Sequence, residues 1–160
     1  MSNVRRLKMS RTDSLHVLAS EFFRVFSRAE YALKASGFNN GDGPAEANWG
    51  KFARAVEAFV ANPGTPVVRE AIAFILAEPP KKQFIENGQI QWREVKPNTD
   101  SDADALFQYI RRIRNNLFHG GKFNGNWFAP ERSEGLMKAG LAILLAAVEA
   151  EHDVREAYHG

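Results

Sequence analysis

Apolar side chains recur at helical spacing along most of the chain. Between Thr12 and Ser36 they stand three or four residues apart, which predicts one long amphipathic helix. The apolar positions of this segment are Leu15, Leu18, Phe22, Phe26, Ala29 and Leu33. Asp13 suits the positive end of the helix dipole, and Gly37 is expected to end the helix.

Two further helices are predicted from the same spacing together with proline and glycine. After the turn-forming residues 38–43, Pro44 is expected at the first position of a second helix, which Asn62-Pro63-Gly64 ends. The apolar stripe of this helix is Phe52, Val56, Phe59 and Val60. A third helix is expected from about Pro66 to Glu78, because Pro79-Pro80 prevents its continuation.

The helical spacing is interrupted at residues 84–95. Asn87-Gly88 stands between apolar positions there and favours a two-residue turn, so this segment is either a small hairpin or an irregular loop. Candidate caps at residues 98–102 then precede a fourth helix, which Gly120-Gly121 is expected to end. The apolar stripe of this helix is Leu106, Ile110, Ile113 and Leu117.

A last helix is predicted from about Glu131 to Ala157. Acidic residues gather near its end, where they oppose the helix dipole and predict fraying. The pattern as a whole predicts an all-α fold, a helical bundle of about five helices with a small extended or irregular insertion at about 84–95.

Composition narrows the classes of protein to which the chain can belong. The 160 residues are 44% apolar and 25% charged, which is typical of one globular domain. We divide the chain into a basic, flexible tail at 1–11 and a single domain at 12–160. There is no cysteine, which excludes disulfides and thiolate zinc sites and fits a reducing compartment.

No membrane segment or signal peptide is expected. The strongest apolar run, Leu141–Val148, is much shorter than the roughly 20 residues that cross a membrane, and no apolar stretch follows the basic start. A cytoplasmic location is therefore expected. The net charge is only +2, which excludes a generally basic coat for nucleic acid, so any polyanion must be bound by a local cluster of cations.

Residues 109–122 contain such a cluster, with Arg111, Arg112, Arg114 and Lys122 and no acid. At 100° per residue, Arg114 lies about 70° from the centre of the apolar stripe, on the shoulder of the buried face. Arg111, Arg112 and Asn115 are expected to point further outward. Arg114 is therefore the arginine expected in a cleft or interface, where its planar guanidinium can bind two phosphate oxygens.

His119 completes the group of candidate residues. It follows Arg114 by five positions, so on a straight helix the two side chains point about 140° apart. Two arrangements bring an imidazole and a guanidinium together. Either the last turn unwinds at Gly120-Gly121, or a second copy of the chain completes the site.

The run Arg-Asn-Asn-Leu-Phe-His-Gly at 114–120 resembles the signature of the HEPN superfamily (higher eukaryotes and prokaryotes nucleotide-binding domains). That signature is an arginine separated from a histidine by four to six residues, and it usually has a polar residue directly after the arginine, as Asn115 is here. The motif lies on the penultimate predicted helix of a bundle, where this superfamily keeps it. The resemblance covers residues 106–122 and the general architecture.

The resemblance implies a metal-independent endoribonuclease that acts as a homodimer and needs no cofactor, with the two motifs facing each other. Such proteins often serve as toxins with an antitoxin or as anti-phage effectors. Internal cleavage of RNA needs a base, an acid and positive charge at the phosphate. Two copies of His119 can supply the base and the acid, since imidazole titrates near ~6.5. Arg114 would hold the non-bridging oxygens and Asn115 would orient the phosphate or His119, while Arg111, Arg112 and Lys122 would bind RNA.

Other interpretations remain open. A non-catalytic HEPN module would use the same residues to bind nucleotide, RNA or a protein partner, and in a purely structural role His119 caps carbonyls while Arg114 pairs with a carboxylate. Glu149 and His152, followed by Asp153 and His159, have a spacing that can bind a metal. No second such pair stands on another helix, so no metal site is expected.

Overall fold

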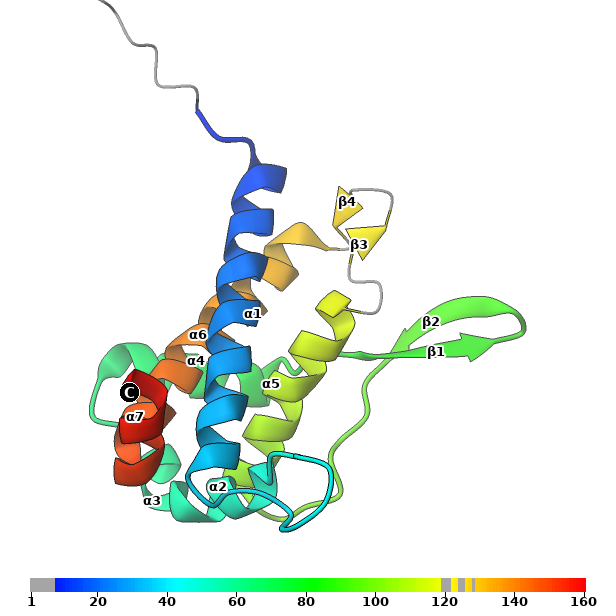
Figure 1. Cartoon of the computed structure of the whole chain (residues 1–160). Helices are drawn as coiled ribbons and strands as arrows, with labels where there is room; N and C mark the ends of the chain where they lie inside the picture. Colours follow the sequence, from blue (N-terminus) through cyan, green and yellow to red (C-terminus); the bar gives the residue numbers. More distant parts are fainter. Residues whose placement is uncertain (1–7, 119–121, 124–125, 128) are drawn as a thin grey trace, which may run out of the picture.

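Helix α1 (Arg11–Ala35) runs the length of the molecule, with α5 (Asp102–Phe118) and α6 (Pro130–Ala150) beside it (Figure 1). The computed structural model describes residues 8–118, 122–123, 126–127 and 129–160. It confirms the predicted all-α fold, a helical bundle with a small hairpin insertion. The other elements are α2 (Trp49–Ala55), α3 (Glu57–Ala61), α4 (Pro66–Ala77), α7 (His152–His159), β1 (Lys82–Glu86), β2 (Gln89–Arg93), β3 (Lys122–Phe123) and β4 (Asn126–Trp127).

The predicted bounds of the first helix agree with the structure to within one residue. Ser10 caps its start, because the hydroxyl accepts a hydrogen bond of 3.1 Å from the backbone N–H of Asp13. The helix ends before Gly37, whose φ of +90° lies in the left-handed region that glycine adopts without strain. The backbone N–H of Phe38 then donates to the carbonyl of Leu33 at 2.9 Å, which closes the end of the helix.

The start of the second predicted helix is wrong. Pro44 lies in a loop that is closed by a hydrogen bond of 2.8 Å from the N–H of Asn48 to the carbonyl of Phe38. The Asn48 side chain accepts a hydrogen bond of 2.8 Å from the N–H of Lys51, so the helix begins at Trp49 instead. The segment is also divided at Val56 into α2 and α3.

The third and fourth helices follow their predicted signals. Thr65 caps α4, Pro66 occupies its first turn, and the helix ends ahead of Pro79-Pro80. The hydroxyl of Ser101 accepts a hydrogen bond of 3.2 Å from the N–H of Asp104 at the start of α5. The end predicted for this helix at Gly120-Gly121 lies outside the described residues.

The last predicted helix is divided in two. Glu151 has extended backbone between α6 and α7, and its carboxylate accepts a hydrogen bond of 2.7 Å from the N–H of Val154. Glu151 and Asp153 therefore stand at the start of a new helix, where negative charge is favourable. The predicted opposition between these acids and the helix dipole is wrong, because it assumed one continuous helix.

An aromatic cluster joins α1, α2 and α5 inside the bundle. The rings of Phe26 and Trp49 lie 5.4 Å apart, and those of Phe52 and Phe107 lie 5.3 Å apart. The indole N–H of Trp49 donates to a carboxylate oxygen of Glu30 at 3.1 Å, so its polar atom has a partner. Among the described residues, every fully buried side chain belongs to a hydrophobic residue. No described helix combines the length and apolar character that a membrane crossing requires.

Residues 82–93 form the hairpin that the sequence left open against an irregular loop. Strands β1 and β2 pair antiparallel, with Glu86 opposite Gln89 across the turn. Asn87 and Gly88 have φ values of +50° and +73°, as a tight two-residue turn requires. The hairpin projects away from the bundle beside the end of α5 (Figure 1). It therefore stands next to the segment that carries the candidate residues.

Candidate functional site

Arg114 is held on the shoulder of α5, as the helical spacing predicts. Its guanidinium carbon lies 6.0 Å from the ring centre of Phe26 on α1 and 5.2 Å from that of Phe118, one turn later on α5. The side chain is half-buried, while 65% of Phe118 is exposed. Contact with two aromatic faces fixes the guanidinium without neutralising its charge.

Asn115 is the one predicted partner that the structure brings to Arg114. Its side-chain oxygen accepts a hydrogen bond of 3.1 Å from Nη1 of Arg114. Among the residues that the structure describes, no carboxylate forms an ion pair with Arg114. Its Nε and Nη2 atoms donate no hydrogen bond to these residues. The acids at the start of α5 stand about 15 Å along the helix axis from Arg114. The guanidinium is therefore a positioned cation with unused donors.

The other two arginines of α5 differ from each other. Arg111 is exposed, which agrees with its predicted outward direction. Arg112 was also expected to point outward, and this prediction is wrong. Arg112 is half-buried, and its Nη1 donates to the carbonyls of Val95 at 2.8 Å and Pro80 at 3.1 Å. The prediction failed because the segments that flank the hairpin cover this side of α5.

Burial lowers the pKa of the Arg112 guanidinium from its ordinary value, against a smaller opposing effect of Tyr109. The guanidinium also lies 5.3 Å from the ring centre of Tyr109. These contacts fasten the two ends of the hairpin segment to α5. Arg112 is thus engaged in the fold, and the cations left for a ligand on the described part of α5 are Arg111 and Arg114.

The remaining candidates lie outside the described residues. His119 is one of them, and so is the side chain of Lys122. The question of whether the last turn unwinds or a second copy completes the site therefore stays open. Asn116, the next residue of the motif, is described. Its side-chain N–H donates to the carbonyl of Lys81 at 2.8 Å, which ties the motif to the base of the hairpin.

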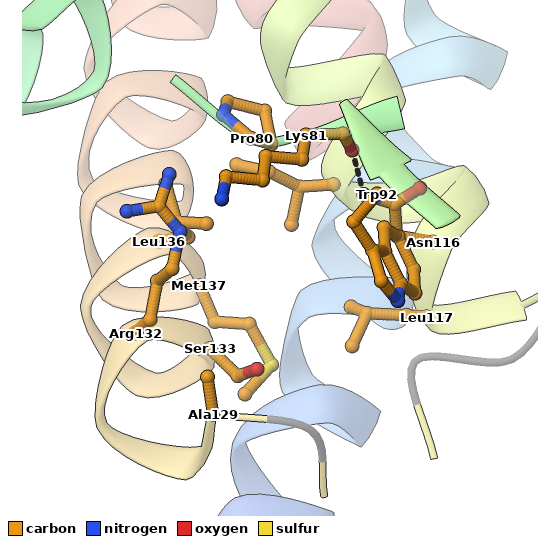
Figure 2. A pocket seen from close by; sticks show the side chains of 11 residues that line it. Pro80, Lys81, Trp92, Asn116, Leu117, Ala129, Arg132, Ser133, Leu136 and Met137 are labelled. Carbon is orange, nitrogen blue, oxygen red and sulfur yellow. Dashed lines mark hydrogen bonds between the residues drawn. The ribbon is translucent and has the colours of Figure 1, made fainter. Parts of the chain in front are cut away.

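Sequence reasoning missed a cavity of about 300 Å³ between α5, α6 and the base of the hairpin (Figure 2). Its walls are mostly apolar, with Trp92, Leu117 and Met137 among them, and Asn116 and Arg132 at its polar positions. The carbonyl of Pro79 accepts a hydrogen bond of 2.7 Å from Arg132. A pocket of this size and character suits a small ligand. The sequence held no signal for it, because its walls come from three separated segments.

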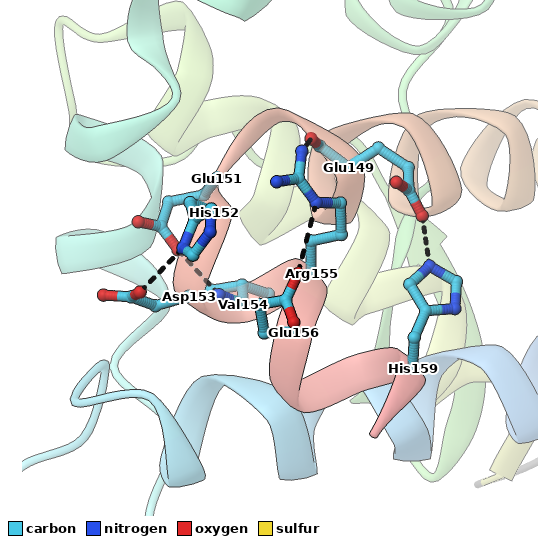
Figure 3. A network of polar contacts seen from close by, with 8 residues as sticks. All are labelled: Glu149, Glu151, His152, Asp153, Val154, Arg155, Glu156 and His159. Atoms are coloured by element: carbon cyan, nitrogen blue, oxygen red, sulfur yellow. Dashed lines mark hydrogen bonds and ion pairs between the residues drawn. The ribbon is translucent and has the colours of Figure 1, made fainter.

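The residues whose sequence spacing can bind a metal lie at the end of α6 and on α7. Figure 3 shows Glu149 directed at His159, and His152 beside Asp153. Nδ1 of His152 lies 3.1 Å from a carboxylate oxygen of Asp153. Glu149 and His152, the pair with metal-binding spacing, thus take different partners. Within the described ranges, no group of three or more acidic or histidine side chains is arranged to hold a metal ion.

Comparisons with protein-family models, with curated proteins and with solved structures found no match for this chain. The resemblance to the HEPN superfamily accordingly rests on the motif and on the helical architecture.

Proposed function

We propose that the protein is a metal-independent endoribonuclease of the HEPN type that cleaves RNA by attack of the 2′-hydroxyl group. The observation that carries the proposal is the state of Arg114. Its guanidinium is fixed over two aromatic rings, bonded to Asn115, and paired with no carboxylate in the described part of the chain. A cation held in this way suits a phosphate better than it suits a structural ion pair.

The proposed reaction assigns one role to each residue of the motif. Arg114 binds the non-bridging phosphate oxygens, where negative charge develops in the transition state. Asn115 orients the guanidinium through the hydrogen bond already present. His119 of one copy removes the proton of the 2′-hydroxyl, and His119 of a second copy protonates the leaving 5′-oxygen. The products then carry a 2′,3′-cyclic phosphate and a 5′-hydroxyl.

RNA binding is assigned to cations outside the reacting group. Arg111 is exposed one turn before Asn115, and Lys122 follows the motif in sequence. Arg112 is left out of this role, since its Nη1 atom already donates to two backbone carbonyls. Service as a toxin with an antitoxin, or as an anti-phage effector, is part of the same proposal.

The test compares RNA cleavage by the full chain and its variants in the presence of a chelator. Arg114→Ala and His119→Ala should each abolish cleavage, and Arg114→Lys should restore it only in part because lysine lacks the planar pair of donors. His152→Ala and Arg24→Ala are matched controls, because both residues are exposed and lie on other helices. Both controls should cleave at the rate of the unmodified chain.

Three results would overturn the proposal. They are cleavage that persists in both motif variants, cleavage that requires an added metal ion, and cleavage of a strand whose scissile nucleotide has a 2′-deoxy sugar. The last result excludes attack by the 2′-hydroxyl, because that nucleophile is then absent.

A second candidate function is favoured by the cavity beside the same helix. A non-catalytic module would bind a nucleotide there, with the base against Trp92 and the phosphate near the exposed Lys81. This candidate predicts that adenosine monophosphate changes the tryptophan fluorescence and that Trp92→Leu removes the change. It also predicts no cleavage of RNA by the unmodified chain. Absence of any nucleotide-dependent change would exclude it.

A further inference from the structure

Strand β1 presents an unpaired backbone edge to the solvent. In a hairpin with a two-residue turn, the residues that flank the turn exchange backbone hydrogen bonds, and the pattern alternates from there. Glu86, Phe84 and Lys82 therefore bond to β2, whereas the N–H and C=O groups of Gln83 and Ile85 point away from it. Among the described residues, no backbone or side-chain group bonds to the outward groups of Gln83 or Ile85, and on this side α5 reaches only the carbonyl of Lys81, just before the strand.

The same part of the hairpin is apolar and exposed. Ile85 is 71% exposed, and Ile90, which lies directly opposite it on β2, is 53% exposed. A two-stranded hairpin that stands away from its domain has little stability of its own in water. An open strand edge with apolar side chains is also a template for pairing with another strand. The outer edge of β1 can therefore pair with a further strand.

The charges of β1 identify the partner. The sequence of β1 is Lys-Gln-Phe-Ile-Glu, so a positive charge lies two residues before Phe84 and a negative charge lies two residues after it. An antiparallel copy of β1 centred on Phe84 places Lys82 opposite Glu86 of the second copy, and this pairing occurs twice. It also gives Lys82 an opposite charge, and Glu86 adds this contact to the ion pair that it forms with Arg93 of its own chain. Within one chain Lys82 faces Arg93, a like-charge pair that is unfavourable across strands.

The backbone pattern fits the same register. When the pairing is centred on Phe84, Gln83 of each copy faces Ile85 of the other. These are the residues whose backbone N–H and C=O groups point to the outer edge. Each such pair exchanges two hydrogen bonds, so the two pairs give four. The two Phe84 side chains then lie on one face as a close cross-strand pair, which is favourable for aromatic rings.

We propose that two copies of the chain associate by antiparallel pairing of their β1 edges around a two-fold axis at Phe84, which forms a continuous four-stranded sheet. In this arrangement the Lys82 residues of the two copies are about 14 Å apart along the strands. The carbonyl of Lys81, three residues before Phe84, accepts a hydrogen bond from Asn116, so the axis lies about 10 Å along the strand from its contact with α5. The pairing rests on the geometry of the hairpin and is independent of RNA cleavage.

The first experiment measures the mass of the full chain by sedimentation velocity over a series of concentrations. Ile85→Pro removes an N–H that points to the outer edge of β1 and leaves the bonds to β2 intact, so it should give a monomer. Ile90→Pro is the matched control. It changes the residue directly opposite, removes an outward N–H from β2, and should leave the dimer unchanged.

The second experiment exchanges charges and does not depend on proline. Lys82→Glu brings two carboxylates together at each pair, and Glu86→Lys brings two ammonium groups together. Each variant alone should therefore raise the dissociation constant of the dimer by roughly tenfold or more. When the two variants are mixed, both pairs become opposite again, and the mixture should form a heterodimer with nearly the original affinity.

The outcomes distinguish the inference from the proposed function. An unmodified chain that sediments as a monomer at all concentrations overturns the inference, and so does a dimer that survives Ile85→Pro or is lost in Ile90→Pro. If Ile85→Pro fails to fold, as judged by circular dichroism, the mixing experiment decides. Failure of the mixed variants to associate then overturns the inference. RNA cleavage by a chain with no β1 pairing would leave the proposed function standing.

Discussion

Replacing Arg112 by alanine should release the hairpin segment from α5. The substitution removes hydrogen bonds from Nη1 to the carbonyls of Pro80 and Val95, at 3.1 Å and 2.8 Å. It also removes the contact between the guanidinium and the Tyr109 ring. A hydrogen bond from a charged donor contributes about 1.5–3 kcal/mol to stability. Because Arg112 is only half-buried, we expect the loss of both hydrogen bonds to destabilise the attachment of the hairpin by about 2 kcal/mol.

The effect should be concentrated in the hairpin. Hydrogen exchange measured by mass spectrometry should show the amides of residues 82–93 that bond across the hairpin exchanging roughly 30-fold faster, the factor that corresponds to about 2 kcal/mol. Amides of α1 that exchange by local opening should be protected as before, because the aromatic core does not include Arg112. A fall in the urea midpoint, followed by circular dichroism, should accompany the faster exchange.

Arg111→Ala provides the matched control for this prediction. Arg111 precedes Arg112 on the same helix and is exposed, so its loss should change the free energy of unfolding by less than about 0.5 kcal/mol. The reasoning is refuted if Arg112→Ala leaves hairpin exchange unchanged, or if the two variants are equally destabilised.

Three further predictions concern packing, turn geometry and charge. Gly140→Ala should destabilise the fold by about 1–3 kcal/mol in urea, because the added Cβ meets a ring carbon of Phe22 at 2.8 Å, whereas Gly64→Ala, with open space around it, should change stability little. Gly88→Ala should speed hairpin exchange by roughly tenfold because alanine is strained at a φ of +73°, and unchanged exchange would contradict the assigned turn. A hydrogen bond from Lys138 lowers the pKa of Glu134 below its ordinary 4.5, so this pair stabilises the fold above that pH and the stabilisation is lost as the pH falls through the lowered pKa. Glu134→Gln should therefore lessen the dependence of the urea midpoint on acid, and an unchanged pH profile would show that the pair does not contribute.

Local signals predicted much of the fold. The spacing of apolar residues placed α1 and α4 correctly, since each has a side-chain cap and a glycine or proline at its end. Asn87-Gly88 favoured a two-residue turn for the same reason, because the turn depends on two adjacent residues, and the sequence left a hairpin and an irregular loop both open around it. The failures depend on distant contacts. The start of α2 was misplaced because the loop before it is closed through Phe38.

The candidate site shows the same division. The direction of Arg114 follows from its place on one helix, and the structure agrees with it. The direction of Arg112 depends on residues 80 and 95, which belong to another part of the chain, so no count along α5 reveals it. The cavity beside α6 was missed for the same reason. The break at Glu151 contains no glycine or proline. In the sequence, a glutamate that caps the start of α7 cannot be told from a glutamate inside a continuous helix.

The most direct test of the account is the chemistry of the ends that the unmodified chain leaves on RNA in the presence of a chelator. Mass spectrometry of the fragments should find a 2′,3′-cyclic phosphate on one end and a 5′-hydroxyl on the other, and neither fragment should form with His119→Ala. Fragments that carry a 5′-phosphate, or the same fragments from His119→Ala, would contradict the account.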